Sequence, residues 1–126
     1  MKALLSLVIV GLGGFFGSAA RYALSGFVHR FLPGSMFPWG TLAVNLTGCF
    51  LVGLLFGLGD NRQFFSSESR LFLLVGVLGG FTTFSTFGLE SINLLRDGES
   101  LRALSYVLLH VLVGLGAVWA GFICSR

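Results

Sequence analysis

The sequence predicts an all-α integral membrane protein with four transmembrane helices, in a single domain that covers residues 1–126. Hydrophobic residues make up 55% of the chain and charged residues only 10%, whereas about a quarter of an ordinary soluble domain is charged. A compact soluble protein of 126 residues could not hide so much apolar side chain from water. The apolar residues also fall into four stretches, each near the roughly 20 residues needed to cross a bilayer.

The boundaries of the four stretches follow from the polar and helix-breaking residues between them. The expected spans are about residues 3–28, 39–58, 71–95 and 101–123. The first is expected to be a retained helix, because no convincing cleavage site interrupts it. Pro33 and Pro38 end the first span and begin the second. Polar runs at 60–70 and 96–99 separate the later spans. An even number of spans places both termini on the same side of the membrane.

The basic residues that flank the spans are almost evenly divided between the two sides. Lys2, Arg62, Arg70 and Arg126 are expected on the side of the termini, against Arg30, Arg96 and Arg102 on the other. A protein with one fixed orientation usually shows a clear excess of lysine and arginine on one side. The near balance favours insertion in both orientations and an antiparallel, dual-topology homodimer. The alternative is that the insertion machinery imposes one orientation.

Glycines recur at a spacing of four within the spans. The pairs are Gly13 with Gly17, Gly53 with Gly57, and Gly76 with Gly80. This spacing lets two helix backbones approach closely in a membrane. It predicts a tight helix bundle with a self-associating surface.

The third span contains a segment that is a poor helix. Two adjacent glycines, Gly79 and Gly80, are followed by β-branched threonines. We therefore expect the third helix to be broken in the middle of the membrane, where irregular backbone is tolerated only if it is buried or lines a cavity. Broken helices of this kind build ion sites in transporters.

Hydroxyl groups and phenylalanines alternate just after these glycines. The hydroxyl residues are Thr82, Thr83, Ser85 and Thr86, and the phenylalanines are Phe81, Phe84 and Phe87. Each hydroxyl could bond back to its own helix, but four in five positions favour a polar path. The phenylalanines repeat every three residues and are expected to share a face, either as a packing stripe or as a pore lining. Ring edges carry partial positive charge and can contact an anion weakly, which suits conduction.

Five further polar side chains within the apolar spans are candidate site residues. They are Arg21, Asn45, Glu90, Tyr106 and His110. Arg21 either faces a partner or a water-filled vestibule, or snorkels to the membrane surface. The Asn45 amide can donate to an anion. Glu90 is expected to belong to the ion pathway. Two alternative roles for Glu90 are a proton-binding site and an ion-pair partner for Arg21. Tyr106 and His110 are four residues apart and share a helix face.

These residues resemble the Fluc (CrcB-type) family of bacterial fluoride channels over essentially the whole chain. The matching motifs are Gly13-Gly14-xx-Gly17 through Arg21-Tyr22, Gly40-Thr41-xxx-Asn45-xx-Gly48, and Gly76-xx-Gly79-Gly80-x-Thr82-Thr83-Phe84-Ser85-Thr86-Phe87. The resemblance implies a dual-topology homodimer in the bacterial inner membrane, surrounded by lipid, with two pores that export fluoride and so protect against fluoride toxicity.

The resemblance also implies roles for individual residues. Phe84 and Phe87 would line each pore with their ring edges, and Asn45 would donate to fluoride. The backbone carbonyls of Gly79 and Thr82 would hold a structural sodium ion on the dimer axis. Thr83, Ser85 and Tyr106 would belong to a polar track, with Arg21 near the aqueous entrance. Gly114 and Gly116 stand where the family pattern has a small hydroxyl residue, at the far end of that track.

Other classes of protein fit the sequence less well. It has no nucleophile–base pair, paired carboxylates or phosphate loop, so it is not expected to be an enzyme. The net charge of +3 comes without a basic stripe, which argues against a nucleic-acid partner. The alternative function is a small proton-coupled exporter of the four-helix multidrug type, but the first span lacks the necessary carboxylate. A fluoride antiporter that uses Glu90 and a non-transporting membrane subunit are further alternatives.

Overall fold

The computed structural model describes residues 1–62 and 65–126, which are helical apart from short turns and the connections between helices. Within these residues, seven α-helices and two π-helical turns follow one another. They are α1 (Lys2–Phe31), α2 (Trp39–Arg62), α3 (Ser67–Arg70), η1 (Leu71–Leu78), α4 (Gly79–Phe81), α5 (Phe84–Arg96), α6 (Ser100–Leu108), η2 (Leu109–Val113) and α7 (Gly114–Cys124).

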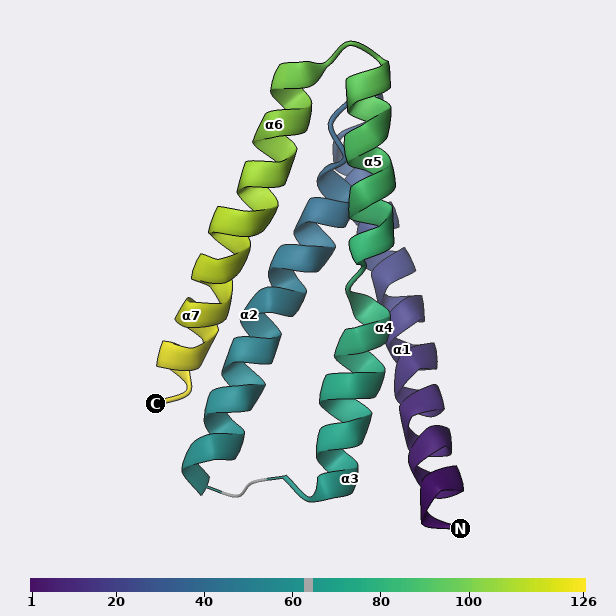
Figure 1. Ribbon diagram of the computed structural model, residues 1–126, viewed down its shortest axis with the longest axis vertical. Helices are drawn as coiled ribbons and strands as arrows, with labels where there is room; N and C mark the ends of the chain where they lie inside the picture. The colour runs from purple at the N-terminus through teal and green to yellow at the C-terminus, as the bar shows by residue number, and fades with distance from the viewer. Residues whose placement is uncertain (63–64) are drawn as a thin grey trace.

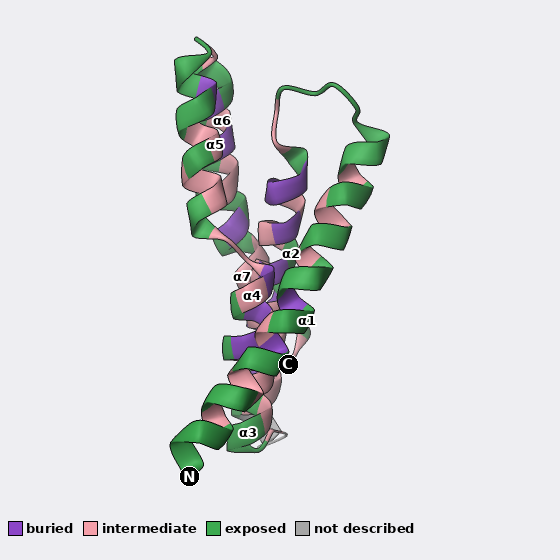
Figure 2. Ribbon diagram, turned by 90° about the vertical axis from the view of Figure 1, so that its right-hand side faces the viewer, coloured by how far each residue is buried: buried purple, intermediate pink, exposed green. Residues whose placement is uncertain are grey.

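Four stretches of these helices are long and apolar enough to cross a membrane. They are Lys2–Phe31, Trp39–Asp60, Ser67–Arg96 and Ser100–Cys124, so α3 to α5 form the third and α6 to α7 the fourth. The expected all-α architecture with four long apolar helices is confirmed. The outer faces carry exposed large side chains such as Leu7, Phe15 and Trp119, and Figure 2 shows exposed residues along most of each helix, with buried residues in the middle of the molecule and along the upper part of α2. In a membrane, lipid would cover such apolar outer faces.

The helices associate in two close pairs, which Figure 1 shows as separate arms of the molecule. The first helix packs against η1 and α4, and α2 packs against α7. The two arms converge toward the upper part of Figure 1, where α2 lies beside α5. Both termini lie toward the lower end of Figure 1, where α2 ends and α3 begins, and the turn between α5 and α6 is at the opposite end.

The repeated glycines form the contacts inside both pairs. A Cβ atom on Gly13 would lie 2.8 Å from the Cα atom of Gly76, and one on Gly17 would overlap the Val77 carbonyl oxygen. In the other pair, a Cβ atom on Gly53 would overlap the Val118 carbonyl oxygen. The predicted close approach of helix backbones is therefore confirmed between helices of the same chain. Whether glycines also mediate self-association stays a prediction.

The third apolar stretch bends at two threonines. Thr82 and Thr83 are extended, with φ −87° and ψ 158° at the first and φ −149° and ψ 120° at the second. β-Branched side chains favour such extended backbone. The Thr83 hydroxyl then accepts the Thr86 N–H at 3.2 Å, so α5 begins with an N-cap of its own. That this bend lies in the middle of a membrane stays a prediction.

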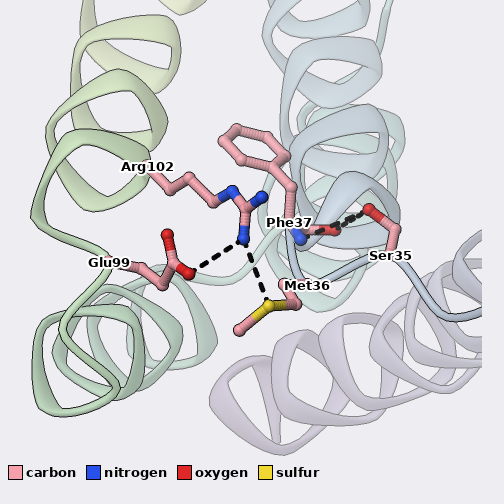
Figure 3. A network of polar contacts seen from close by, with 5 residues as sticks. All are labelled: Ser35, Met36, Phe37, Glu99 and Arg102. Carbon is pink, nitrogen blue, oxygen red and sulfur yellow. Dashed lines mark hydrogen bonds and ion pairs between the residues drawn. The ribbon is translucent and has the colours of Figure 1, made fainter.

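The loop between α1 and α2 is fixed to the start of α6 by a small polar network (Figure 3). Arg102 Nη1 lies 3.2 Å from a Glu99 carboxylate oxygen and 3.1 Å from the Met36 sulfur. Next to Met36, the Phe37 N–H donates to the Ser35 hydroxyl at 3.3 Å. The Phe37 ring then packs edge-on against Tyr106, with 5.4 Å between ring centroids. The loop therefore covers one end of the buried Tyr106 side chain.

Candidate functional site

The bend in the third helix is held by one side chain from α2. The Asn45 amide nitrogen donates to the Thr83 carbonyl at 3.0 Å, and the Thr83 N–H donates to the Asn45 side-chain oxygen at 2.9 Å. In a continuous α-helix the Thr83 N–H would instead donate to the Gly79 carbonyl, four residues earlier. Asn45 thus gives an acceptor to the backbone N–H that the bend deprives of its helical partner, and it adds a second donor to the Thr83 carbonyl, which caps α5. This pair of bonds is called the Asn45–Thr83 clamp below.

A histidine from the fourth helix contacts the clamp from the other side. His110 Nε2 lies 3.2 Å from the Asn45 amide nitrogen, and His110 Nδ1 lies 3.0 Å from the Tyr106 carbonyl oxygen. The ring also packs against Phe87 and Tyr106, at centroid distances of 4.5 and 4.4 Å. Asn45 therefore connects the bend to the fourth helix as well as to α2.

Glu90 lies behind these rings in a polar cluster. The Thr41 hydroxyl donates to one carboxylate oxygen at 3.0 Å, and the Tyr106 hydroxyl donates to the other at 2.5 Å. Tyr106 is fully buried, with 0% of its surface exposed. Arg21 is not the partner of Glu90 in the described residues, because both carboxylate oxygens bind hydroxyls and Arg21 faces a separate cavity. The alternative that Glu90 pairs with Arg21 within one chain was therefore wrong. The direction of a side chain depends on the rotation of its helix, which cannot be inferred from the spacing of residues in the sequence.

Phe84 and Phe87 lie together on α5, whereas Phe81 does not share their face. The centroids of Phe84 and Phe87 are 5.5 Å apart, and Phe84 is 83% exposed. Phe81 precedes the bend and is buried in α4, where it approaches Gly48. The expectation of one stripe of three rings was therefore wrong, because the two extended residues rotate α5 relative to α4.

Two cavities meet at Thr83. The larger, of about 440 Å³, is lined by residues that include Asn45, Gly79, Thr82, Thr83, Phe84 and Phe87. The smaller, of about 400 Å³, is lined by Arg21 and by a set of hydroxyl residues that includes Ser18, Ser25, Thr41, Thr83 and Thr86. One threonine thus lies between a largely apolar cavity, which contains two phenylalanine rings, and a hydroxyl-rich cavity that contains the arginine.

The candidate pathway residues fall into four places. Asn45, Thr83, Phe84 and Phe87 line the larger cavity, and Arg21 lines the smaller one. Tyr106 and Glu90 are bonded to each other on the far side of Phe87 and line neither cavity. Ser85 is exposed at the start of α5, with its hydroxyl 3.4 Å from that of Thr83. The structure therefore brings Asn45, Thr83, Phe84 and Phe87 together around one cavity. The remaining candidates are connected to this group through Thr83 or Phe87.

Sequence reasoning gave no defined role to two residues of this site. Thr41 was part of a quoted motif, yet its bond to Glu90 joins residues that are 49 positions apart. His110 was expected to share a helix face with Tyr106 and to offer a further hydrogen-bond donor, with no partner named. That spacing of four was the available signal, and it corresponds to the contact between the two rings. The approach of Asn45 to His110 depends on tertiary packing.

Backbone carbonyls are the groups in this site that suit a hard cation. No cluster of three or more histidine, cysteine or carboxylate side chains is found among the described residues. The Thr83 N–H, however, is diverted to Asn45, so the Gly79 carbonyl lacks its usual helical donor. Gly79 and Thr82 both line the larger cavity. Carbonyl oxygens are ligands that hard cations accept, so the donor set fits such an ion.

Comparison with known proteins places the chain in a family. The family model described as "CrcB-like protein, Camphor Resistance (CrcB)" matches residues 8–122. The chain belongs to the CrcB family. A fluoride-specific ion channel FluC from Methylobacillus flagellatus is 46% identical over 116 residues, covering 92% of this chain and 91% of the relative. The family resemblance noted from the motifs is confirmed.

Further CrcB relatives cover nearly the whole chain. A fluoride-specific ion channel FluC from Agrobacterium fabrum is 45% identical over 123 residues, or 98% of each chain. The protein of the same name from Magnetococcus marinus is 47% identical over 117 residues, or 93% of this chain and 94% of the relative. Together with its four long apolar helices, this makes the CrcB-family chain a multi-pass membrane protein.

Proposed function

We propose that this chain forms a fluoride-selective ion channel, which exports F⁻ from the cytoplasm down its electrochemical gradient and so protects the cell against fluoride toxicity. The observation that supports this most directly is the larger cavity, where an amide, a hydroxyl and two phenylalanine rings converge at a bent helix. Relatives that cover almost the whole chain are named fluoride-specific ion channels. The protein is accordingly a passive transporter and not an enzyme.

The chemistry of the cavity suits a small anion that must lose its water. Fluoride is strongly hydrated, so a pathway has to replace the lost water with other donors and yet bind weakly enough to release the ion. The hydroxyls of Thr83 and Ser85 and the amide of Asn45 are the available donors, and ring edges of Phe84 and Phe87 add weak contacts. Both Asn45 amide hydrogens already face protein acceptors, the Thr83 carbonyl and His110 Nε2. Fluoride would have to displace one of these acceptors, so it would bind only weakly to the Asn45 amide.

The two ends of the pathway have different electrostatic character. Arg21 in the smaller cavity would raise the local concentration of an anion before it enters. Beyond Phe87, the Tyr106 hydroxyl and Glu90 continue the polar path. A narrow, rigid passage between these ends would exclude chloride by size. In acidic surroundings HF diffuses into the cell and ionises at cytoplasmic pH, and the channel lets the resulting fluoride leave.

The proposed assembly is an antiparallel, dual-topology homodimer in the bacterial inner membrane. The near-even division of basic residues between the two sides supports insertion in both orientations. The exposed Phe84 ring and the cavity of about 440 Å³ beside it leave a face that a second copy would cover. Each copy would then complete the walls of the other's pathway.

Dual topology predicts that the C-terminal cysteine reacts from both sides of the membrane. The chain has two cysteines, so Cys49→Ala leaves Cys124, which is exposed near the C-terminus. An impermeant maleimide added to sealed spheroplasts should label about half of the copies, as an antiparallel pair requires, and detergent should expose the rest. Labelling of all copies, or of none, before detergent is added would contradict the antiparallel dimer.

Sodium is the proposed structural ion of this dimer. The carbonyls of Gly79 and Thr82 from each subunit would hold it, which gives four oxygen ligands around the dimer axis. When bound, Na⁺ would neutralise the partial negative charge of carbonyls that the bend leaves without helical donors. Two observations support this proposal. The Thr83 N–H donates to Asn45 and not to the Gly79 carbonyl, and Gly79 and Thr82 line the same cavity.

Efflux from liposomes tests the channel directly. Purified protein should release fluoride quickly and leave chloride inside. Phe84→Ile should slow fluoride release about fivefold, because it removes an aromatic edge worth roughly 1 kcal/mol. Phe31→Ile is the matched control, since Phe31 is an exposed ring at the end of α1 and should leave release unchanged.

The same assay distinguishes the alternatives. Release that saturates with fluoride and follows an imposed proton gradient would indicate an antiporter, with Glu90 as the proton carrier. An absence of fluoride release from well-folded dimers would overturn the channel and turn attention to the small multidrug exporter and the non-transporting subunit.

A further inference from the structure

The orientation of the Asn45 amide group is fixed by the backbone of Thr83. The Thr83 N–H can only donate and the Thr83 carbonyl can only accept. The side-chain oxygen of Asn45 must therefore face the N–H, at 2.9 Å, and its nitrogen must face the carbonyl, at 3.0 Å. A flipped amide would bring two donors together and two acceptors together. As a result, a hydrogen-bearing nitrogen also points at His110.

The protonation of His110 follows from its two neighbours. The Tyr106 carbonyl, 3.0 Å from Nδ1, can only accept, so Nδ1 must carry a hydrogen. The Asn45 nitrogen, 3.2 Å from Nε2, can only donate, so Nε2 must be without one. The two constraints come from different helices, and they agree on one neutral tautomer.

We propose that His110 is a positioning residue for Asn45: as the neutral Nδ1–H tautomer, it accepts one amide hydrogen and holds the clamp on Thr83 in a single orientation. The inference rests on the proposed function, because Asn45 and Thr83 belong to the proposed fluoride pathway. It defines a relay of four hydrogen-bonded groups, which runs from the Tyr106 carbonyl through His110 and Asn45 to the extended peptide at Thr83.

The packing around the ring supports this role. Phe87 and Tyr106 contact the imidazole at centroid distances of 4.5 and 4.4 Å, which restricts its rotation. His110 also lies in the π-helical turn η2, and such turns inside α-helices occur frequently at functional sites. The half-buried ring is thus held from two sides, with Nε2 directed at Asn45.

The relay can be tested by changing the ring while keeping its shape or its acceptor. His110→Phe preserves the aromatic packing but removes Nε2, and it should lower fluoride efflux about tenfold, the factor expected for one hydrogen bond in a polar network. His110→Gln retains an acceptor and should restore most of the rate. His29→Gln changes the other histidine of the chain and should leave efflux unchanged. All variants are compared as folded protein of equal elution volume.

The tautomer itself can be measured without any transport assay. In the His29→Gln chain reconstituted in lipid, ¹⁵N NMR of labelled histidine should show a protonated Nδ1 and a bare Nε2 at neutral pH. A proton on Nε2, or wild-type efflux by His110→Phe, would overturn the positioning role. If the wild-type chain carries no fluoride, the proposed function fails, while the NMR result still decides the tautomer.

Discussion

Replacing Gly17 by alanine is expected to destabilise the protein by roughly 1–3 kcal/mol, the usual cost of overpacking a close-packed interior. The added methyl group would overlap the Val77 carbonyl oxygen and lie 2.8 Å from the Phe81 backbone nitrogen. Both neighbours belong to the helical backbone, so neither can move aside by rotating a side chain. The first and third helices would have to separate. The midpoint of thermal unfolding in detergent, followed by tryptophan fluorescence, should fall accordingly.

Gly11 supplies a matched control on the same helix. A Cβ atom at Gly11 has nothing within 4 Å, so Gly11→Ala should be neutral or slightly stabilising, because alanine favours helix. The second helix pair offers the same comparison. A Cβ atom at Gly121 would overlap the Phe50 carbonyl oxygen, whereas one at Gly116 has open space around it. Equal stability of Gly17→Ala and Gly11→Ala would contradict the close backbone contact.

The helices were predictable because their signals are local. A stretch of about 20 apolar residues is enough to identify a span, and the four stretches appear in the structure in the expected order. The glycine spacing predicted close helix pairs for the same reason, since each motif lies within one helix. The segment around Gly79 and Gly80 was expected to be irregular, and extended backbone occurs at the next threonines, Thr82 and Thr83.

The partners of the polar residues were less predictable. Whether Glu90 faces Arg21 or Tyr106 depends on how α5 is rotated after the bend, and two extended residues set that rotation. The same rotation removes Phe81 from the face shared by Phe84 and Phe87. The sequence indicated that the Asn45 amide can donate to an anion, but it could not indicate that the backbone of Thr83 binds both polar atoms of that amide.

Replacing Asn45 by aspartate is expected to have the largest effect on transport. The two side chains have nearly the same shape, but the carboxylate oxygen would face the Thr83 carbonyl and His110 Nε2, which both accept hydrogen bonds. Two hydrogen bonds would become repulsive contacts, and each buried group left unpaired costs about 1–3 kcal/mol. A negative charge would also repel fluoride. We expect efflux from liposomes to fall by roughly 100-fold, as a loss near 3 kcal/mol implies.

Thr47→Val is the matched control for this change. Thr47 also lies on α2, but its hydroxyl donates to the Ala43 carbonyl of its own helix at 2.7 Å. Removing that hydroxyl eliminates a polar group from the same helix without touching the bend, so efflux should stay near the wild-type rate. A similar loss in both variants would point to general damage to α2 and would contradict the specific role of Asn45.

Hydrogen exchange at the bend separates the two tasks given to Asn45. The Thr83 N–H is protected by the Asn45 oxygen, and aspartate can still accept this bond, whereas Asn45→Leu cannot. The Thr83 amide should therefore exchange faster in Asn45→Leu than in Asn45→Asp, although both variants should lose most of their fluoride efflux. If Asn45 only held the bend, Asn45→Asp would keep more transport than Asn45→Leu, in proportion to its slower exchange. Equal loss of efflux with unequal exchange would show that holding the bend is not sufficient, and that fluoride passage also needs the neutral amide donor in place of a carboxylate.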